Sequence, residues 1–104
     1  MPQLSLDRYL VDVLMRDLVG HDRAPSAFLV YLWLWSRSRG EGRAKVGASL
    51  QTIATQTGLS KSAVQNGVRR LTQRRLVEVE RAGPTSAPVY EVLQPWLKRG
   101  AGAG

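Results

Sequence analysis

The sequence predicts a mostly helical α+β domain in which several helices precede a β-hairpin. Before residue 75, apolar residues recur at intervals of three and four, which is the spacing of amphipathic helices. After residue 76 the pattern changes to alternation in two short runs, typical of half-buried strands. A length of 104 residues with 43% hydrophobic residues predicts one globular domain.

The first helix is expected over residues 5–19, with Gly20 at its end. One face carries five apolar residues, namely Leu6, Leu10, Val13, Leu14 and Leu18. Two roles remain open for this helix. It packs on its own domain, or it pairs with the same helix of a second copy.

The second helix is expected over residues 24–38, with Pro25 suited to its first turn. Residues 27–35 are all apolar and include four aromatic residues, so this helix must be covered on every side. At this density the aromatic residues favour a core or dimer interface over a cage for a small ligand. A polar, arginine-rich loop follows over residues 36–45, and a short strand is expected at Val46.

Residues 49–77 combine a short helix, a tight turn and a longer helix. Ser49 and Ser60 stand where each helix needs an N-cap, and Gly58 stands where the chain must reverse. The longer helix has one apolar stripe made of Val64, Val68 and Leu71. The opposite stripe contains no acidic residue and consists of Ser62, Gln65, Asn66, Arg69 and Gln73.

This stretch resembles the winged helix-turn-helix DNA-binding domains of bacterial regulators and plasmid replication proteins. The matching residues are Ile53-Ala54, Thr57-Gly58-Leu59-Ser60, Lys61-Ser62, Val64, Val68, Leu71 and Leu76-Val77. The resemblance covers residues 45–93 and implies a winged helix-turn-helix fold to which an N-terminal helix is added. Two residues depart from the family pattern. Gly67 stands where alanine is usual, at a cost of ~1 kcal/mol in helicity, and Arg75 replaces the glycine that often ends the helix, which predicts a less sharp end.

The expected domain spans residues 1–98, with the helix-turn-helix at 49–75 and the wing at 76–93. Strands at 76–81 and 88–93 flank a turn-rich tip and form the C-terminal β-hairpin. Residues 95–97 are expected to fold back on the core, and residues 99–104 to form a disordered tail.

The charge is divided unevenly along the chain. Residues 1–35 hold three arginines and four aspartates, whereas residues 36–104 hold twelve lysines or arginines and four glutamates. The basic excess therefore coincides with the helix-turn-helix, which favours a nucleic-acid partner.

These features predict sequence-selective binding of double-stranded DNA, as in a transcriptional regulator. The helix at about 61–74 is expected in the major groove, with base contacts from Gln65, Asn66 and Arg69, because amides suit adenine and arginine suits guanine. Contacts with the DNA backbone are expected from Thr52, Ser60, Lys61, Ser62, Arg70 and Arg74. Wing contacts are expected from Arg81, Thr85 and Ser86. Selectivity calls for two adjacent half-sites, so a homodimer through the N-terminal helices is a candidate assembly.

Other classes of function receive less support. The domain also suits a plasmid replication initiator or a winged-helix protein-interaction module. An enzyme is not expected, because the chain has no cysteine, no nucleophile beside its one histidine, His21, and no phosphate-binding loop. No cofactor or metal is expected, and Glu78 and Glu80 are read as solvated strand residues. Without a membrane-length apolar segment or a signal-peptide pattern, the expected location is the cytoplasm.

Overall fold

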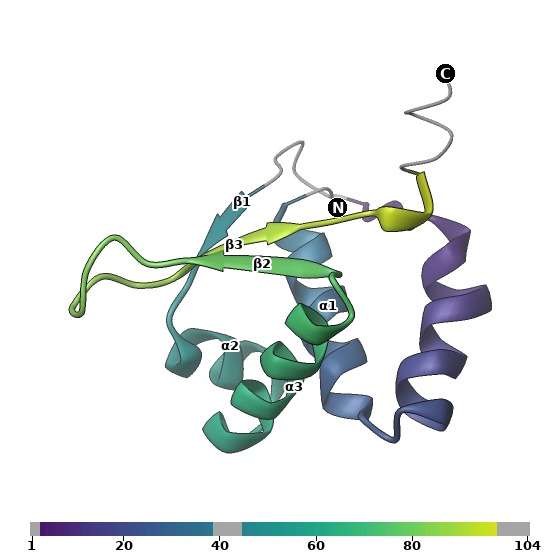
Figure 1. The fold of residues 1–104 in the computed structure, drawn as a ribbon, viewed down its shortest axis with the longest axis horizontal. Coiled ribbons are helices and arrows are strands. Elements are labelled where there is room, and N and C mark those ends of the chain that lie inside the picture. Colours follow the sequence, from purple (N-terminus) through teal and green to yellow (C-terminus); the bar gives the residue numbers. More distant parts are fainter. Residues whose placement is uncertain (1–2, 39–44, 98–104) are drawn as a thin grey trace.

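A computed structural model describes residues 3–38 and 45–97 of the chain. A small antiparallel sheet lies along one side of the helices (Figure 1). The elements follow the order η1 (Leu10–Leu14), η2 (Arg16–His21), α1 (Pro25–Arg37), β1 (Lys45–Gly47), α2 (Leu50–Thr57), α3 (Lys61–Gln73), β2 (Val77–Glu80) and β3 (Val89–Val92), where η denotes π-helical hydrogen bonding. Their buried apolar side chains form a single cluster.

The N-terminal helix differs from the one expected over residues 5–19. It consists of η1 and η2, which meet at Met15, and it extends to His21. Its helical segment starts later than expected, because the Asp7 carboxylate accepts the Tyr9 amide at 2.9 Å. Leu6 therefore lies before the helix and is 38% exposed. The residues that the helix buries are Leu10, Leu14 and Leu18.

The expected second helix is confirmed as α1, with Pro25 at its start. Its aromatic side chains belong to the core, where Tyr31 is fully buried and its hydroxyl donates to the Leu93 carbonyl at 2.7 Å. Trp35 is also buried, and its indole N–H donates to the Ser5 carbonyl at 3.0 Å. These bonds tie α1 to both ends of the described chain.

Gly67 lies where α3 crosses α1. A Cβ at this position would lie 3.1 Å from the Ser26 carbonyl oxygen and 3.2 Å from the Cα and N of Ala27. The departure from alanine therefore has a packing reason, since a Cβ here would push the two backbones apart by a few tenths of an ångström.

The helix-turn-helix caps are confirmed. The Ser49 hydroxyl accepts the Thr52 amide at 3.0 Å, and the Ser60 hydroxyl accepts the Ala63 amide at 3.1 Å. Between the two helices Gly58 has a φ of +81°, a left-handed conformation that favours glycine.

The end of α3 is sharper than Arg75 had suggested. The Leu76 amide donates to the Leu71 carbonyl at 2.9 Å, and the Arg75 amide donates to the Thr72 carbonyl at 3.1 Å. This hydrogen-bond pair is a Schellman motif. Arg75 occupies its left-handed position with a φ of +58°, so arginine adopts here the conformation in which glycine is usual.

The expected wing is confirmed by a sheet with strand order β1-β3-β2, in which both pairings are antiparallel. Tyr90 of β3 pairs with Val46 of β1 and Val79 of β2. Beyond β3 the chain returns to the core as expected, since Trp96 stacks on Tyr9 with ring centroids 4.4 Å apart. The Trp96 indole also donates to Asp7 at 2.9 Å.

The expected tail at 99–104 lies outside the described residues, as do residues 39–44 of the expected arginine-rich loop. Among the helices of the described segments, none is both long and apolar enough to cross a membrane.

Candidate nucleic-acid interface

One side of α3 is fixed to the core and the opposite side faces solvent. Val64, Gly67 and Leu71 are buried. The polar stripe expected to meet DNA is exposed along its whole length, namely Ser62, Gln65, Asn66, Arg69 and Gln73. We call these five residues the polar stripe.

Two of the expected base-contacting residues are hydrogen-bonded to each other. The Arg69 guanidinium donates to the Asn66 side-chain carbonyl at 3.1 Å, across nearly one helical turn. Arg69 has five donors and Asn66 keeps its amino group, so both residues retain donors that can face outward. Gln65, the third such residue, is exposed beside them.

The expected backbone-contacting residues at the start of the motif lie at helix N-termini. Thr52 and Ser60 take part in capping, and the hydroxyls of Ser60 and Ser62 lie 3.2 Å apart. Lys61 is exposed at the first position of α3. Exposed helix N-termini that carry hydroxyl groups and a lysine have the chemistry that phosphate oxygens require.

Arg74 is placed differently from this group. Its guanidinium lies 3.5 Å from the Asp17 carboxylate and 3.4 Å from the Asp22 carboxylate, so it connects α3 to the N-terminal helix and to the loop after it. Arg70 also contributes its charge at Asp22. Both arginines therefore lie on the flank of α3 that faces the N-terminal part of the chain.

Asp22 has only 5% of its side chain exposed. The pKa of its carboxyl is lowered, first by the hydrogen bond with His21, whose Nδ1 lies 2.9 Å away. The charges of Arg74 and Arg70 lower the pKa further, while burial opposes them. The negative charge of Asp22 is thus compensated within the fold.

The wing tip carries the remaining expected contacts. Arg81, Thr85 and Ser86 are exposed, and the tip extends well beyond the helices (Figure 1). A turn closed by the Ser86 amide and the Gly83 carbonyl, 3.2 Å apart, shapes it.

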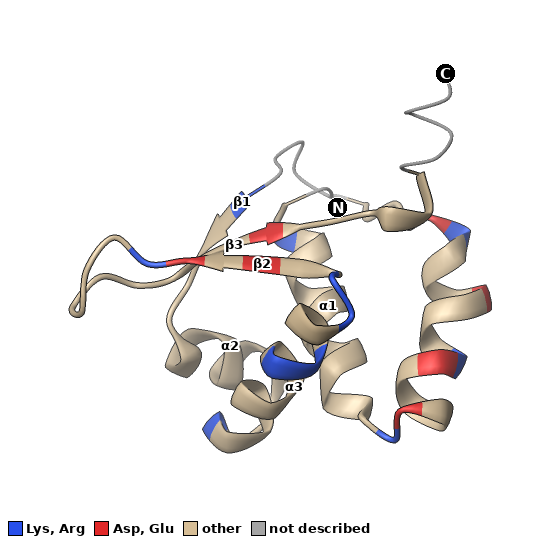
Figure 2. Ribbon diagram, viewed as in Figure 1, with Lys and Arg blue, Asp and Glu red and all other residues tan. Residues whose placement is uncertain are grey.

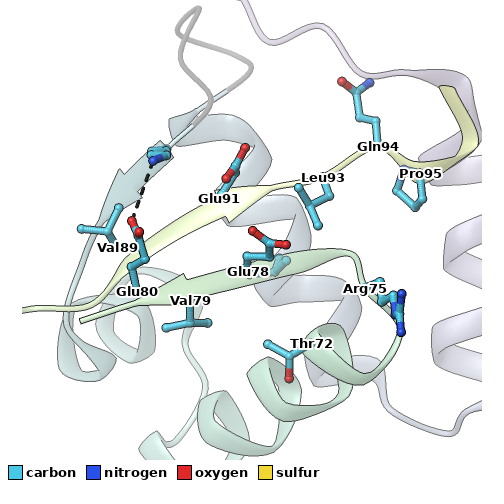
Figure 3. Close-up of a pocket in the computed structure, with 12 residues that line it drawn as sticks. Thr72, Arg75, Glu78, Val79, Glu80, Val89, Glu91, Leu93, Gln94 and Pro95 are labelled. Atoms are coloured by element: carbon cyan, nitrogen blue, oxygen red, sulfur yellow. Dashed lines mark ion pairs between the residues drawn. The ribbon is translucent and has the colours of Figure 1, made fainter. Parts of the chain in front are cut away.

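The outer face of the sheet has the opposite charge. Acidic residues gather on β2 and β3, whereas the charged residues of α3 are all basic (Figure 2). Glu78, Glu80 and Glu91 border a hollow of about 730 Å³, and Lys45 lies 3.7 Å from Glu80 (Figure 3). Carboxylates repel phosphate, which disfavours this face as a nucleic-acid interface. In the described segments, no cluster of three or more histidine or carboxylate side chains has a metal-binding arrangement.

Sequence reasoning missed a second hollow, of about 590 Å³, between α3 and the start of α1. Asn66, Arg69 and Gln73 of the polar stripe line it from one side, while Arg23 and Ser26 line it from the other. Residues so distant in sequence are brought together only by the crossing of α1 and α3, and no local pattern signals this juxtaposition.

Comparisons with known proteins agree with this geometry. The profile of a helix-turn-helix domain family matches residues 24–77, from the start of α1 to the start of β2. Among solved structures, the crystal structure of AntR, an antimony-specific transcriptional repressor, matches with 23% identity and a TM-score of 0.50, over 88% of this chain and 71% of that chain. This likeness concerns the fold. A comparison with curated protein sequences finds no match. The chain belongs to the helix-turn-helix domain family, and its three-stranded sheet gives it the winged form of this DNA-binding fold.

Proposed function

We propose that this protein is a non-enzymatic transcriptional regulator that binds double-stranded DNA with sequence selectivity. The observation that carries the proposal is the polar stripe, which is exposed, free of acidic residues and mounted on a helix whose other side is anchored in the core. A helix of this kind fits the major groove of B-DNA.

In this proposal α3 lies in the major groove, with Gln65, Asn66 and Arg69 at base edges. Thr52, Ser60, Lys61, Ser62 and Arg70 hold phosphates, and the wing residues Arg81, Thr85 and Ser86 touch the adjacent backbone or minor groove. Arg74 also belonged to the expected phosphate contacts. Its ion pairs with Asp17 and Asp22 favour a tethering role, so we assign it to the scaffold.

The N-terminal helix supports a homodimer. Val11, Met15 and Val19 recur every four residues and are 48%, 39% and 40% exposed. An apolar stripe of this kind suits contact with the same stripe of a second copy. Two copies would present two α3 helices to adjacent half-sites of one duplex.

The proposed location is the cytoplasm, as the resemblance to bacterial regulators implies. The chemistry of the polar stripe favours DNA over a protein partner, which weakens the interaction-module interpretation. A replication initiator would use the same surface on DNA. The antimony specificity of AntR is not carried over, because the likeness concerns the fold and this chain has no cysteine to offer a thiolate ligand.

Selection of bound duplexes from a random pool tests the proposal. At about 50 and 200 mM salt we expect enrichment of one common motif, with weaker binding at the higher salt. A variant with alanine at Gln65, Asn66 and Arg69 is the control, and it should bind without enriching that motif. A wild-type pool that stays random would contradict sequence selectivity, and no binding at either salt would contradict DNA binding itself.

A further inference from the structure

The hollow between α3 and the start of α1 opens beside the polar stripe. It has a volume of about 590 Å³ and shares Asn66, Arg69 and Gln73 with that stripe. Arg70 lines it as well, on the flank of α3 nearest to α1. Any duplex that meets the polar stripe therefore comes close to this hollow.

The charges around the hollow favour an anion. Arg23, Arg69 and Arg70 line it, and Asp22 is the acidic residue among its lining. The Asp22 carboxylate is turned to other partners, His21 at 2.9 Å and Arg74 at 3.4 Å, and its side chain is 5% exposed. The balance of charge that the hollow presents to solvent is therefore positive.

Arg23 is available to such an anion. It is exposed, and no residue of the described segments forms a hydrogen bond or ion pair with its guanidinium. Ser26, one turn further along, also lines the hollow and adds a hydroxyl donor. A guanidinium and a hydroxyl that line the same hollow are well suited to phosphate oxygens.

The dimensions of DNA indicate which phosphate group lies nearest to the hollow when α3 enters the major groove. The major groove is about 12 Å wide, and a helix with its side chains is about 10–12 Å across, so the two backbone strands run close along the flanks of an inserted helix. Thr72 near the end of α3, and Arg75 just after it, adjoin the sheet. Asn66 and Arg70 adjoin the start of α1 instead. The two flanks of α3 are thus bordered by different parts of the fold.

We propose that Arg23, together with Ser26 and Arg70, binds a phosphate of the DNA strand that borders the major groove on the α1 side. This inference rests on the proposed function. It assigns to the loop before α1 a positioning role that opposes the wing across α3, so that the duplex is held from both flanks. Phosphate contacts fix register and carry no base information.

The test compares variants that remove the Arg23 charge without straining its backbone. Arg23 has a φ of +54°, so glycine and asparagine both suit its position, and Arg23→Gly and Arg23→Asn serve as two independent variants. Arg75→Gly is the matched control, because Arg75 is the other arginine with positive φ and lies at the sheet hollow. Thermal unfolding followed by circular dichroism establishes that each variant is folded.

Binding to the selected duplex and to a random duplex is measured over a series of salt concentrations. Both Arg23 variants should weaken binding to the two duplexes by the same factor, roughly threefold to tenfold at low salt. The slope of log K against log salt should fall by about 1. Arg23→Lys should retain most of the slope, and Arg75→Gly should retain all of it.

A second readout localises the contact. Single neutral methylphosphonates are placed along each strand of the selected duplex, and one position on the α1-side strand should weaken the wild type but not Arg23→Gly. Two results would overturn the phosphate site and leave the proposed function intact. One is a salt slope in both Arg23 variants equal to that of the wild type, and the other is an equal fall of this slope in Arg75→Gly. A wild type that binds neither duplex would overturn both.

Discussion

The N-terminal helix and α3 each bury one side, but their exposed sides differ in chemistry. The N-terminal helix exposes Val11, Met15 and Val19. In contrast, α3 exposes amides, a serine and an arginine. The free energy falls when one apolar surface covers another, because both leave water. Polar donors and acceptors instead match the edges of bases. This difference agrees with the proposal that the N-terminal helix meets a second copy and α3 meets DNA.

The two helices are also connected. Arg74, at the end of α3, reaches Asp17 of the N-terminal helix and Asp22 in the loop after it. An assembly formed through the N-terminal helices would therefore hold α3 at a defined position. Mutations in each helix, and at the connection between them, can therefore test this contrast.

The largest effect is expected where α3 meets α1. Gly67→Val would place side-chain carbons against the backbone of Ser26 and Ala27, and should lower the free energy of unfolding by about 1–3 kcal/mol. Urea denaturation measures this loss. Gly47→Val is the control, because a Cβ at Gly47 meets nothing within 4 Å. Equal urea midpoints for the two variants would show that the close approach of α1 and α3 is wrong.

The next effect concerns the apolar stripe of the N-terminal helix. Met15→Glu should raise the dissociation constant of the homodimer at least tenfold, or about 1.4 kcal/mol, because a carboxylate would enter an apolar contact. Sedimentation equilibrium measures the association. The neighbouring exposed Arg16→Gln should leave it nearly unchanged. A wild type that stays monomeric at all concentrations would contradict the dimer.

A smaller effect is expected for the connection at Asp22. Its pKa is lowered in the folded protein, so its contribution to stability is present above the unfolded value of ~3.9 and is lost as the pH falls through the lowered value. Between pH 6 and pH 3, urea midpoints of the wild type should therefore fall more steeply than those of Asp22→Asn. Asp12→Asn, which removes an exposed carboxylate paired with Arg8, is the control. Parallel curves for the wild type and Asp22→Asn would contradict the lowered pKa of Asp22, to which His21 contributes most and Arg74 adds.

The smallest effect is expected at the end of α3. Arg75→Gly should raise the free energy of unfolding by a few tenths of a kcal/mol, up to about 1, because glycine tolerates the φ of +58° better than arginine. Thermal unfolding measures the gain. A loss of stability would show that the Arg75 side chain contributes more than its backbone costs.

The features that sequence predicted are those set by local chemistry. Ser49, Gly58 and Ser60 act within a few residues of their own positions, so their roles at the helix ends follow from residue type. The spacing of Val64 and Leu71 likewise indicates the buried side of α3 before any partner is known. Once that side is fixed, the polar stripe must face solvent.

The features that sequence did not predict depend on contacts between distant segments. Gly67 was expected only to weaken α3. Its packing role was missed because the Ser26 backbone that it approaches lies in another helix. The later start of the N-terminal helix depends on Asp7, which also binds Trp96. The role that we propose for Arg23 depends on the fold, which places it at the same hollow as Arg70.

The most direct test of the DNA-reading role of α3 compares Arg69→Ala with Lys61→Ala on the selected duplex and on a random one. Arg69→Ala should weaken binding to the selected duplex by about 1–3 kcal/mol and relax the preference at one base pair, with a much smaller loss on random DNA. Lys61→Ala should weaken both duplexes equally. If Arg69→Ala also weakens both duplexes equally, the polar stripe does not read sequence.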